Sequence, residues 1–559
     1  MSAFRPRTAR TARSARTIRT ARAARIPALL VTTTAVAAGL VPAGSAVAVS
    51  GPEAAAGQHT AVVKLNIGDE PNGRGCTGTL IDASWVLTAA SCFAATPGTT
   101  VPAGAPALKA TVILADGKRI AVAELAPRTD RDLTLARLAT PATGPTGITY
   151  AAAAPAAGAE LTAVGLGRTA TEWAPLKAHT GAFTLGASDS TTLSITGKGT
   201  DAICKGDTGG PLVNAAGEVV GVNSRSWQGG CLSADPAETR TGAIAARADG
   251  LREWIDGIRS TTPGWQTRAL VQSGTGLYQS VRLADGSWTG YTDVQDKAGS
   301  LGGIRSSAAA GINGDTHILA ISNSGGLFHT LRKPDGTWST FGDVFAAANS
   351  LGSLTQVSAV SIGHDLHVIA VADGKAFHTV RNSAGSWTPF RQVNGTVTGV
   401  TAAATASVRG ELQVGLISGG KVYHSIRQTN GSWLPWGNVN QVVGATGPVT
   451  SLTMAGTGDD TQLVISTDNG TRQYHTIRNV SGSWTVWGDL KDYLGTVTTK
   501  SLAAAAVNGE FQLAATTTDG KLLHTTRRAD RTWATTVAVP LKGIPAAPGH
   551  LAITANHNG

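Results

Sequence analysis

Residues Cys204–Leu212 read CKGDTGGPL, a glycine-rich turn that leads into an apolar strand, and this segment is the most informative one of the N-terminal half. Two further segments precede it, Cys76–Cys92 (CTGTLIDASWVLTAASC) and Asp132–Leu138 (DLTLARL). Short β-type runs such as Val219–Val222 surround all three, separated by loops rich in Ala, Gly and Pro. Short strands at this spacing predict a β-barrel or a β-sandwich.

The composition of the 559-residue chain excludes several classes of protein. Hydrophobic residues make up 42%, which is too many for a disordered chain. Beyond the N-terminal region no apolar run reaches the roughly 18–20 residues of a membrane span. The net charge of +10 is largely due to eight arginines within residues 1–48, which contain no acid. The remainder has 38 basic against 36 acidic side chains, so nucleic acid is not an expected partner.

The N-terminus predicts export. Arginines are followed by the apolar stretch Ile26–Val41 and by the small residues Ala46–Ala48, which is the pattern of a signal peptide over residues 1–48. The alternative is an N-terminal membrane anchor. We expect a secreted, extracellular protein with no membrane span after signal removal. Its four cysteines then predict two disulfides, although spacing alone leaves three pairings open.

A helix and a linker end the first domain, which we place at residues 49–258. Leu251, Trp254, Ile255 and Ile258 recur at helical spacing and predict an amphipathic helix over residues 249–258. Residues 259–264 are expected to form a linker to a second domain at residues 265–559.

The three quoted segments resemble those of the chymotrypsin/trypsin family of serine peptidases, in the family's chain order. The resemblance covers roughly residues 49–258. It implies two six-stranded β-barrels with a cleft between them, and it resolves the disulfides as Cys76–Cys92 and Cys204–Cys231. Each disulfide contributes about 2–4 kcal/mol to stability.

The same resemblance places the catalytic triad at Ser91, Asp132 and Thr208, and two of these positions depart from the family. Ser91 stands where members have histidine, and Thr208 stands where they have the nucleophilic serine. A hydroxyl nucleophile needs an adjacent base that later protonates the leaving amine. Serine cannot accept a proton near neutral pH, and the β-methyl of threonine restricts χ1. We therefore predict impaired catalysis.

Other groups could replace the missing base. The first domain has only His59 and His179, and both are interpreted as structural or surface histidines. Lys205, three residues before Thr208, is interpreted as a solvated lysine on the rim of the cleft.

The rest of the catalytic apparatus matches the family. The resemblance implies an oxyanion hole formed by the N–H groups of Gly206 and Thr208. Asp207 matches the aspartate that pairs with a newly formed N-terminal amine. Cleavage after Ala48 would expose Val49, which we expect to be its partner. The base of the specificity pocket falls at Ala202, with Asp201 one residue beyond, so a preference for neutral or for basic side chains stays open.

From Trp265 onward the chain is an internal repeat. Its tryptophans recur at intervals of 46–51 residues, and each unit holds about four strand-like runs that end at a turn. This period predicts the blades of a β-propeller, whose exposed apolar faces bury one another. Six units are recognisable, so six or seven blades are possible, and an open β-solenoid is the alternative. The terminal strand Leu551–Thr554 is expected to pair with the first unit and close the ring.

The repeats resemble tachylectin-like and related bacterial lectin propellers, which implies that a glycan or cell-surface carbohydrate is a partner. An indole can pack on a sugar face while imidazoles bond hydroxyls. Alternatively, these residues only hold the blades together. The candidate glycan-binding residues are His329, His378, His424, His475, His524, Trp288, Trp338, Trp387, Trp433, Trp484 and Trp533.

The sequence thus predicts an all-β, two-domain protein: a trypsin-like domain with a degenerate triad joined to a lectin-like propeller. Protein or peptide segments are the expected ligands of the first domain. The alternatives are an active endopeptidase with Thr208 as nucleophile, and a lectin whose peptidase fold is a passenger. We expect no cofactor and no metal, because the repeat histidines stand one per blade, too far apart to share an ion.

Overall fold

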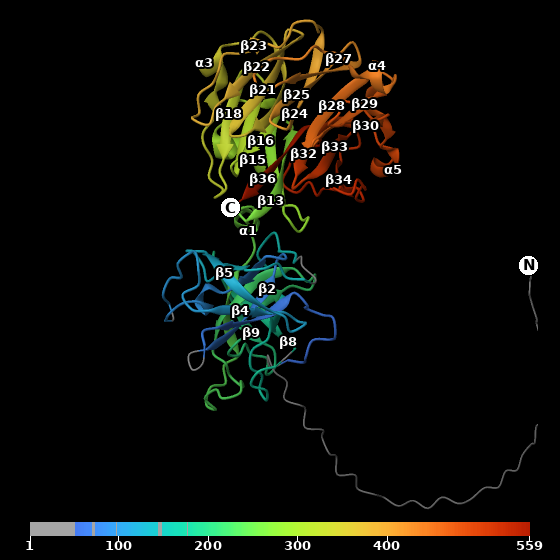
Figure 1. Cartoon of the computed structure of the whole chain (residues 1–559). Helices are drawn as coiled ribbons and strands as arrows, with labels where there is room; N and C mark the ends of the chain where they lie inside the picture. Colours follow the sequence, from blue (N-terminus) through green and yellow to red (C-terminus); the bar gives the residue numbers. More distant parts are fainter. Residues whose placement is uncertain (1–50, 70–72, 97, 144–147, 176, 559) are drawn as a thin grey trace, which may run out of the picture. The chain divides into compact units, whose positions relative to one another are not determined.

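The computed structural model describes residues 51–69, 73–96, 98–143, 148–175 and 177–558 (Figure 1). The predicted signal peptide and Val49 lie outside these residues. The described chain consists of two closed β-barrels, six four-stranded sheets and several short helices. The predicted all-β class, with a trypsin-like pair of barrels before a propeller, is confirmed.

The first barrel is antiparallel, with strand order β1-β2-β3-β6-β5-β4. Leu65, Leu87 and Leu135 fill its interior and are fully buried. Its strands are β1 (Val62–Ile67), β2 (Arg74–Leu80), β3 (Trp85–Thr88), β4 (Ala110–Ile113), β5 (Arg119–Pro127) and β6 (Thr134–Leu138).

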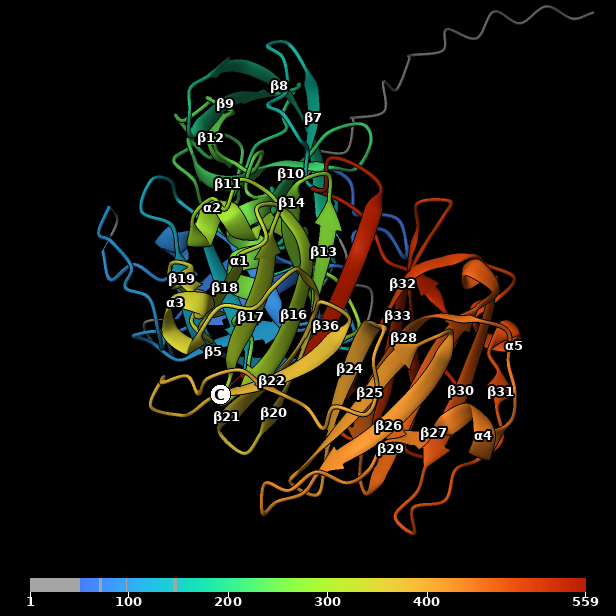
Figure 2. The same ribbon diagram turned by 90° about the horizontal axis from the view of Figure 1, so that it is seen from above.

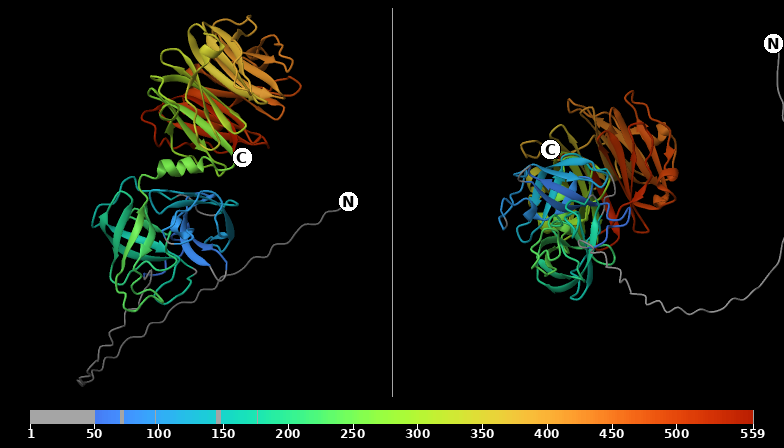
Figure 3. Two further views of the ribbon diagram at one scale, coloured as in Figure 1. Left: turned by 90° about the vertical axis from the view of Figure 1, so that its left-hand side faces the viewer. Right: turned by 90° about the horizontal axis from the view of Figure 1, so that it is seen from below.

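The second barrel repeats this design with strand order β10-β11-β12-β9-β8-β7, and Figure 3 shows the two barrels side by side. Phe183, Leu193 and Leu212 are buried in its core. Its strands are β7 (Glu160–Gly165), β8 (His179–Ser188), β9 (Thr192–Gly197), β10 (Pro211–Val213), β11 (Val219–Ser226) and β12 (Gly242–Arg247).

Both predicted disulfides are present. Cys76 is bonded to Cys92, and Cys204 is bonded to Cys231. The first links β2 to the short 3₁₀ helix η1 (Ala90–Cys92), and the second links the segment before β10 to the loop after β11.

The predicted closing helix is α1 (Arg252–Arg259). It begins later than expected because Gly250 has φ +71°, a left-handed conformation that cannot be part of an α-helix. Ile255 is buried in the core of the first barrel, and Trp254 and Ile258 pack against that core. The apolar stripe therefore has the predicted role.

The C-terminal domain is a β-propeller with six blades, one for each recognised repeat. Four short helices each connect the last strand of one blade to the first strand of the next: α2 (Val294–Ala298), α3 (Val344–Ala348), α4 (Val439–Val443) and α5 (Lys491–Leu494). A 3₁₀ helix, η2 (Asp468–Gly470), precedes β30. The blades are β36 (Pro548–Asn558) with β13 (Gly264–Ser273), β14 (Gly276–Arg282) and β15 (Thr292–Asp293); β16 (Ile304–Ile312), β17 (Asp315–Ser322), β18 (Leu327–Arg332) and β19 (Gly342–Asp343); β20 (Leu354–Ile362), β21 (Asp365–Ala372), β22 (Lys375–Arg381) and β23 (Arg391–Gln392); β24 (Val400–Val408), β25 (Glu411–Ser418), β26 (Lys421–Arg427) and β27 (Gly437–Asn438); β28 (Val449–Thr457), β29 (Asp460–Thr467), β30 (Arg472–Arg478) and β31 (Gly488–Asp489); and β32 (Thr499–Val507), β33 (Glu510–Thr517), β34 (Leu522–Arg527) and β35 (Val537–Ala538).

The ring closes through the first blade. Strand β36, from the C-terminus, pairs antiparallel with β13 from Gly264↔Asn558 to Ser273↔Pro548. Figure 2 shows red β36 beside green β13. The predicted pairing of the two ends is confirmed, and the blade count is six rather than seven.

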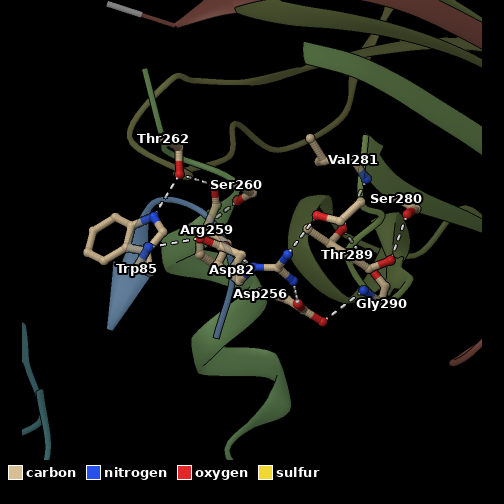
Figure 4. A network of polar contacts seen from close by, with 12 residues as sticks. Asp82, Trp85, Asp256, Arg259, Ser260, Thr262, Ser280, Val281, Thr289 and Gly290 are labelled. Atoms are coloured by element: carbon tan, nitrogen blue, oxygen red, sulfur yellow. Dashed lines mark hydrogen bonds and ion pairs between the residues drawn. The ribbon is translucent and has the colours of Figure 1, made fainter. Parts of the chain in front are cut away.

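A polar network joins α1 and the residues after it to both domains (Figure 4). Arg259 forms an ion pair with Asp82 of the first barrel. The indole N–H of Trp85 donates to Thr262 Oγ1 at 2.8 Å. The N–H of Gly290, in the first blade, donates to Asp256 Oδ2 at 2.7 Å. Helix α1 and the residues after it are therefore bonded to both domains.

Two negative findings apply to the described ranges. No helix there is long and apolar enough to cross a membrane. No group of three or more His, Cys, Asp or Glu side chains there is arranged to hold a metal ion.

Candidate active site

The carboxylate of Asp132, one of the three triad positions, accepts hydrogen bonds from the polar groups around it. It follows β5, and Ser91 lies on η1. The Ser91 N–H donates to Asp132 Oδ1 at 2.7 Å, and the Ser91 hydroxyl donates to Oδ2 at 2.8 Å. The Ser224 hydroxyl, on β11, donates to the same Oδ2 at 2.6 Å. Three donors therefore hold this carboxylate in place, and the Ser91 hydroxyl is one of them.

Thr208 lies in the middle of the turn Gly206–Gly210, just before β10 (Pro211–Val213). Its hydroxyl donates to the backbone carbonyl of Ser224 at 3.3 Å. Among the described residues, that carbonyl is the only hydrogen-bond partner of the hydroxyl. An amide carbonyl has negligible basicity, so Thr208 has no group beside it that could remove its proton. Ser224 thus contacts both Asp132 and Thr208.

Neither histidine of the first domain reaches this site. His59 lies in a turn, where burial lowers the pKa of its imidazole, and its carbonyl accepts the Val62 N–H. His179 begins β8 and pairs with Gly165 and with Glu53. Lys205 is exposed, as predicted for a residue on the rim.

The turn Gly206–Gly210 presents two N–H groups that have no acceptor among the described residues. The N–H groups of Asp207, Gly209 and Gly210 donate to the backbone carbonyls of Cys204, Asn223 and Asp207, respectively. The N–H groups of Gly206 and Thr208 have no described acceptor. Gly206 has φ +100°, and a Cβ there would lie 2.7 Å from Gly167 Cα. The turn therefore requires glycine and leaves this pair of donors available for an oxygen ligand.

Asp207 is a buried carboxylate, 1% exposed. It accepts the N–H of Gly167 and the N–H of Cys204, each at 2.8 Å. Burial raises its pKa to about 7, while these two hydrogen bonds oppose the rise. No described cation forms an ion pair with it. The segment nearest to Val49 lies against β8, since Ala54 N–H donates to Ala178 and Thr180 N–H to Pro52.

The two candidates for the pocket base differ in environment. Ala202 is fully buried beside the Cys204–Cys231 disulfide. Asp201 is half-exposed, and its Oδ2 accepts the Ala182 N–H of β8 at 2.7 Å. Its carboxylate is therefore engaged by the barrel backbone.

The repeat histidines are held between blades. They are buried or half-buried, and each bonds a neighbouring His or Gln side chain at 2.9–3.1 Å. Burial lowers the pKa of His378, His424, His475 and His524 to about 3. Tryptophans of adjacent blades contact these rings edge-on, with centroids 5.3–5.7 Å apart: Trp288–His524, Trp387–His329, Trp433–His378, Trp484–His424 and Trp533–His475.

This geometry favours the interpretation that the repeated residues hold the blades together. All six repeat tryptophans, Trp338 included, are half-buried, and each forms a backbone bridge to the arginine of its own blade. The first blade has Gln279 instead of histidine. Gln279 pairs with Leu270 of β13, and Arg268, two residues earlier on that strand, is fully buried.

Sequence reasoning did not include Ser224 among the site residues. The available signal was its strand, Gly221–Ser224, which matches the peptidase family beside the Cys204–Leu212 turn. Only the fold shows that its hydroxyl and carbonyl connect Asp132 to Thr208.

Comparison with known proteins agrees with this fold. Residues 48–255 match the family model described as Trypsin. A search of curated proteins found no match for the chain. The first domain is therefore a trypsin-family domain, and the propeller lies outside the matched range.

Proposed function

We propose that the trypsin-family domain of this chain binds polypeptide segments in its cleft without hydrolysing them at the rate of an active peptidase. One observation carries the proposal. The hydroxyl of Ser91 takes the hydrogen bond of Asp132 that the family gives to histidine, and the hydroxyl of Thr208 donates to a carbonyl instead of to a base.

The chemistry follows from these two contacts. Peptide hydrolysis needs a group that takes the proton of the nucleophile and returns it to the leaving amine. Ser91 cannot do either near neutral pH. Loss of the base alone lowers the rate by about 10⁶-fold in the subtilisin series. The methyl group of Thr208 further restricts the rotation that would aim its hydroxyl at a carbonyl carbon.

Ligand binding is supported by features that do not depend on the base. The N–H groups of Gly206 and Thr208 have no other described acceptor and suit a peptide carbonyl oxygen. Buried Ala202 at the pocket base, with Asp201 engaged by β8, favours an uncharged side chain over a basic one.

The test uses the purified secreted chain and fluorescently labelled fragments of a denatured protein. We expect saturable binding in fluorescence anisotropy. A Ser226→Trp variant, which fills the cleft beside Thr208, should lose this binding, whereas Ser190→Trp, at the exposed turn before β9, should retain it. Failure of every fragment to bind would reject the proposal.

The same preparation distinguishes the second candidate, an active endopeptidase. The two available N–H donors and the Asp132–Ser224 contact favour it, because both belong to a working site of this family. Turnover of the denatured protein that disappears in a Thr208→Ala variant would establish Thr208 as a nucleophile. We expect no difference between the two proteins.

For the propeller we propose carbohydrate binding at a hollow beside the ring closure rather than at the buried repeat histidines. Trp265 is 40% exposed, and its ring meets exposed His557 edge-on with centroids 5.2 Å apart. Asn313 and Pro334 line the same hollow, whose volume is about 520 Å³. An exposed indole beside amide and imidazole groups suits the apolar face and the hydroxyls of a sugar.

Glycan-array binding by the full chain tests this proposal. Trp265→Ala should abolish the signal, and Tyr493→Ala, another exposed aromatic of the propeller, should leave it intact. Equal loss in both variants, or none in either, would contradict a site at Trp265.

We further propose that the chain acts outside the cell. Its two disulfides suit an oxidising compartment, and the leader over residues 1–48 has the composition of a secretory signal. N-terminal sequencing of the mature protein should begin at Val49.

A further inference from the structure

A long groove runs past Thr208 on the face of the first domain. Its volume is about 1050 Å³, and Gly206, Thr208, Ser224 and Ser226 form part of its lining. The groove therefore includes the two available N–H donors and extends well beyond the triad positions.

Five cationic side chains line this groove. They come from β1, from β2, from the loop after β7, from the turn before β10 and from β11: Lys64, Arg74, Arg168, Lys205 and Arg225. Asp69 is the only acidic residue among the described lining residues, and Glu172 lies within electrostatic reach of Lys64. The described lining thus has a strong excess of positive charge.

None of these five cations forms an ion pair with a described residue. Elsewhere in the domain, arginines such as Arg128, Arg137 and Arg247 are paired with nearby carboxylates. Lys205 and Arg225 are exposed, so their charged groups are available to a ligand. An unpaired concentration of like charge is unfavourable by itself and attracts a ligand of opposite sign.

The backbone holds the cations close to Thr208. Thr77 N–H donates to the Thr208 carbonyl at 2.8 Å, and Lys64 is the direct partner of Thr77 across the β1–β2 ladder. The N–H of Arg168 donates to the Lys205 carbonyl at 2.9 Å. Four of the elements that carry the cations are therefore fixed in register with one another.

The guanidinium of Arg168 stacks on an aromatic ring. Its guanidinium carbon lies 3.5 Å from the ring centroid of Trp173, which is itself 59% exposed. Stacking on an indole holds a guanidinium in place while leaving its N–H edge free to bind a carboxylate.

We propose that this groove selects acidic polypeptide segments, with aspartate and glutamate side chains placed on the groove cations while the main chain lies past Thr208. This inference rests on the proposed peptide-binding function and names its ligand class. A polypeptide is favoured over a sulfated glycan because the groove includes the Gly206 and Thr208 N–H donors, which suit a peptide carbonyl.

The test uses the full secreted chain and three labelled peptides of equal length, rich in glutamate, glutamine or lysine. We expect the glutamate peptide to bind most tightly in fluorescence anisotropy. Its affinity should fall as salt rises from about 0.1 M to about 1 M, because the Debye length shortens from about 10 Å to about 3 Å.

Charge-reversal variants locate the site. Lys205→Glu with Arg225→Glu should weaken binding of the glutamate peptide by about 10-fold or more, since each reversal replaces an attraction by a repulsion. Lys118→Glu with Arg119→Glu makes the same change of charge at two exposed residues, at the end of the turn after β4 and at the start of β5, outside the groove, and should have little effect. Arg74 is left unchanged because it also donates to the Ala94 carbonyl.

The outcomes separate this inference from the function on which it rests. Equal binding of the glutamate and glutamine peptides, unaffected by the groove reversals, would overturn the inference and leave peptide binding standing. Binding of none of the three peptides would overturn both. Binding of heparin but not of the glutamate peptide, lost in the groove variants, would assign the groove to a glycan and overturn the polypeptide assignment.

Discussion

We predict that the stability of the first domain depends on how its N-terminus is processed, because the carboxylate of Asp207 is buried. We compare two forms of the chain, one that begins at Val49 and one that retains a short extension before it. In the extended form no amine is positioned to reach Asp207. In the processed form, the new α-ammonium of Val49 is expected to pair with it.

The size of this difference in stability follows from the pKa of the Asp207 carboxyl. In an unfolded chain the carboxyl has a pKa of 3.8, and burial raises it to about 7 in the fold. The folded state therefore holds the proton of Asp207 more tightly than the unfolded chain does. The contribution of this carboxyl to stability is complete below pH 3.8 and is lost as the pH rises through about 7. A rise of roughly 3 pKa units corresponds to about 4 kcal/mol.

Docking of the ammonium removes this loss, because a neighbouring positive charge favours the ionised carboxylate. For a domain of this size, 4 kcal/mol corresponds to a change of about 10 °C in Tm. We therefore expect the extended form to lose about 4 kcal/mol of stability relative to the processed form as the pH rises from about 4 to about 7.

Differential scanning calorimetry of both forms over this pH range measures the difference directly. The comparison cancels every titrating group that the two forms share, including the propeller histidines. Identical pH profiles for the two forms would refute the assignment of Val49 as partner of Asp207. Asp207→Asn is the control, and it should abolish the difference between the forms.

Three further predictions concern other parts of the chain. Gly206→Ala should destabilise the first domain and lower its peptide affinity. The backbone of residue 206 has φ +100°, and a Cβ there would lie 2.7 Å from Gly167 Cα, so both the conformation and the contact are unfavourable for alanine. A wild-type Tm and affinity would contradict this. Arg268→Gln, which introduces the residue type of Gln413 on β25, should stabilise the propeller by about 1–3 kcal/mol in urea unfolding. The reason is that Arg268 is fully buried and its Nε and Nη1 have no described partner. A loss of stability would show that the bond of Arg268 to the Ser260 carbonyl matters more. Propeller stability should fall as the pH drops from 6.5 toward 3. Burial lowers the pKa of His424 and His475 to about 3, so the folded state holds these imidazoles neutral while the unfolded chain can protonate them. Acid unfolding unchanged by His424→Gln would contradict this.

Local sequence patterns predicted much of this fold. The resemblance of the Cys204–Leu212 turn and its two companion segments to the trypsin family implied the paired barrels and the disulfide pairing, whereas the spacing of the cysteines alone left three pairings open. The start of the helix was predicted too early, at residue 249 instead of Arg252, since only the backbone shows that Gly250 is left-handed. The blade count needed the pairing of β36 with β13, whose residues lie at opposite ends of the repeat region.

The parts of the site that the sequence did not reveal depend on contacts between distant residues. His329 contacts Trp387 of the next blade, and this contact between blades, which the sequence alone does not show, favours a packing role for the repeated residues. The groove cations are spread from Lys64 to Arg225, and the near-neutral net charge of the processed chain hides their concentration on one face. Ser224 gains its role only because β11 passes between Asp132 and Thr208.

The most direct test of the central claim restores the missing chemistry. We would measure cleavage of a denatured protein by the parent chain and by a variant carrying Ser91→His and Thr208→Ser. We predict no turnover by the parent, and turnover by the double variant, because Asp132, Ser224 and the Gly206 and Thr208 N–H groups are already in place. Cleavage by the parent at a rate comparable to that of the variant would contradict the account.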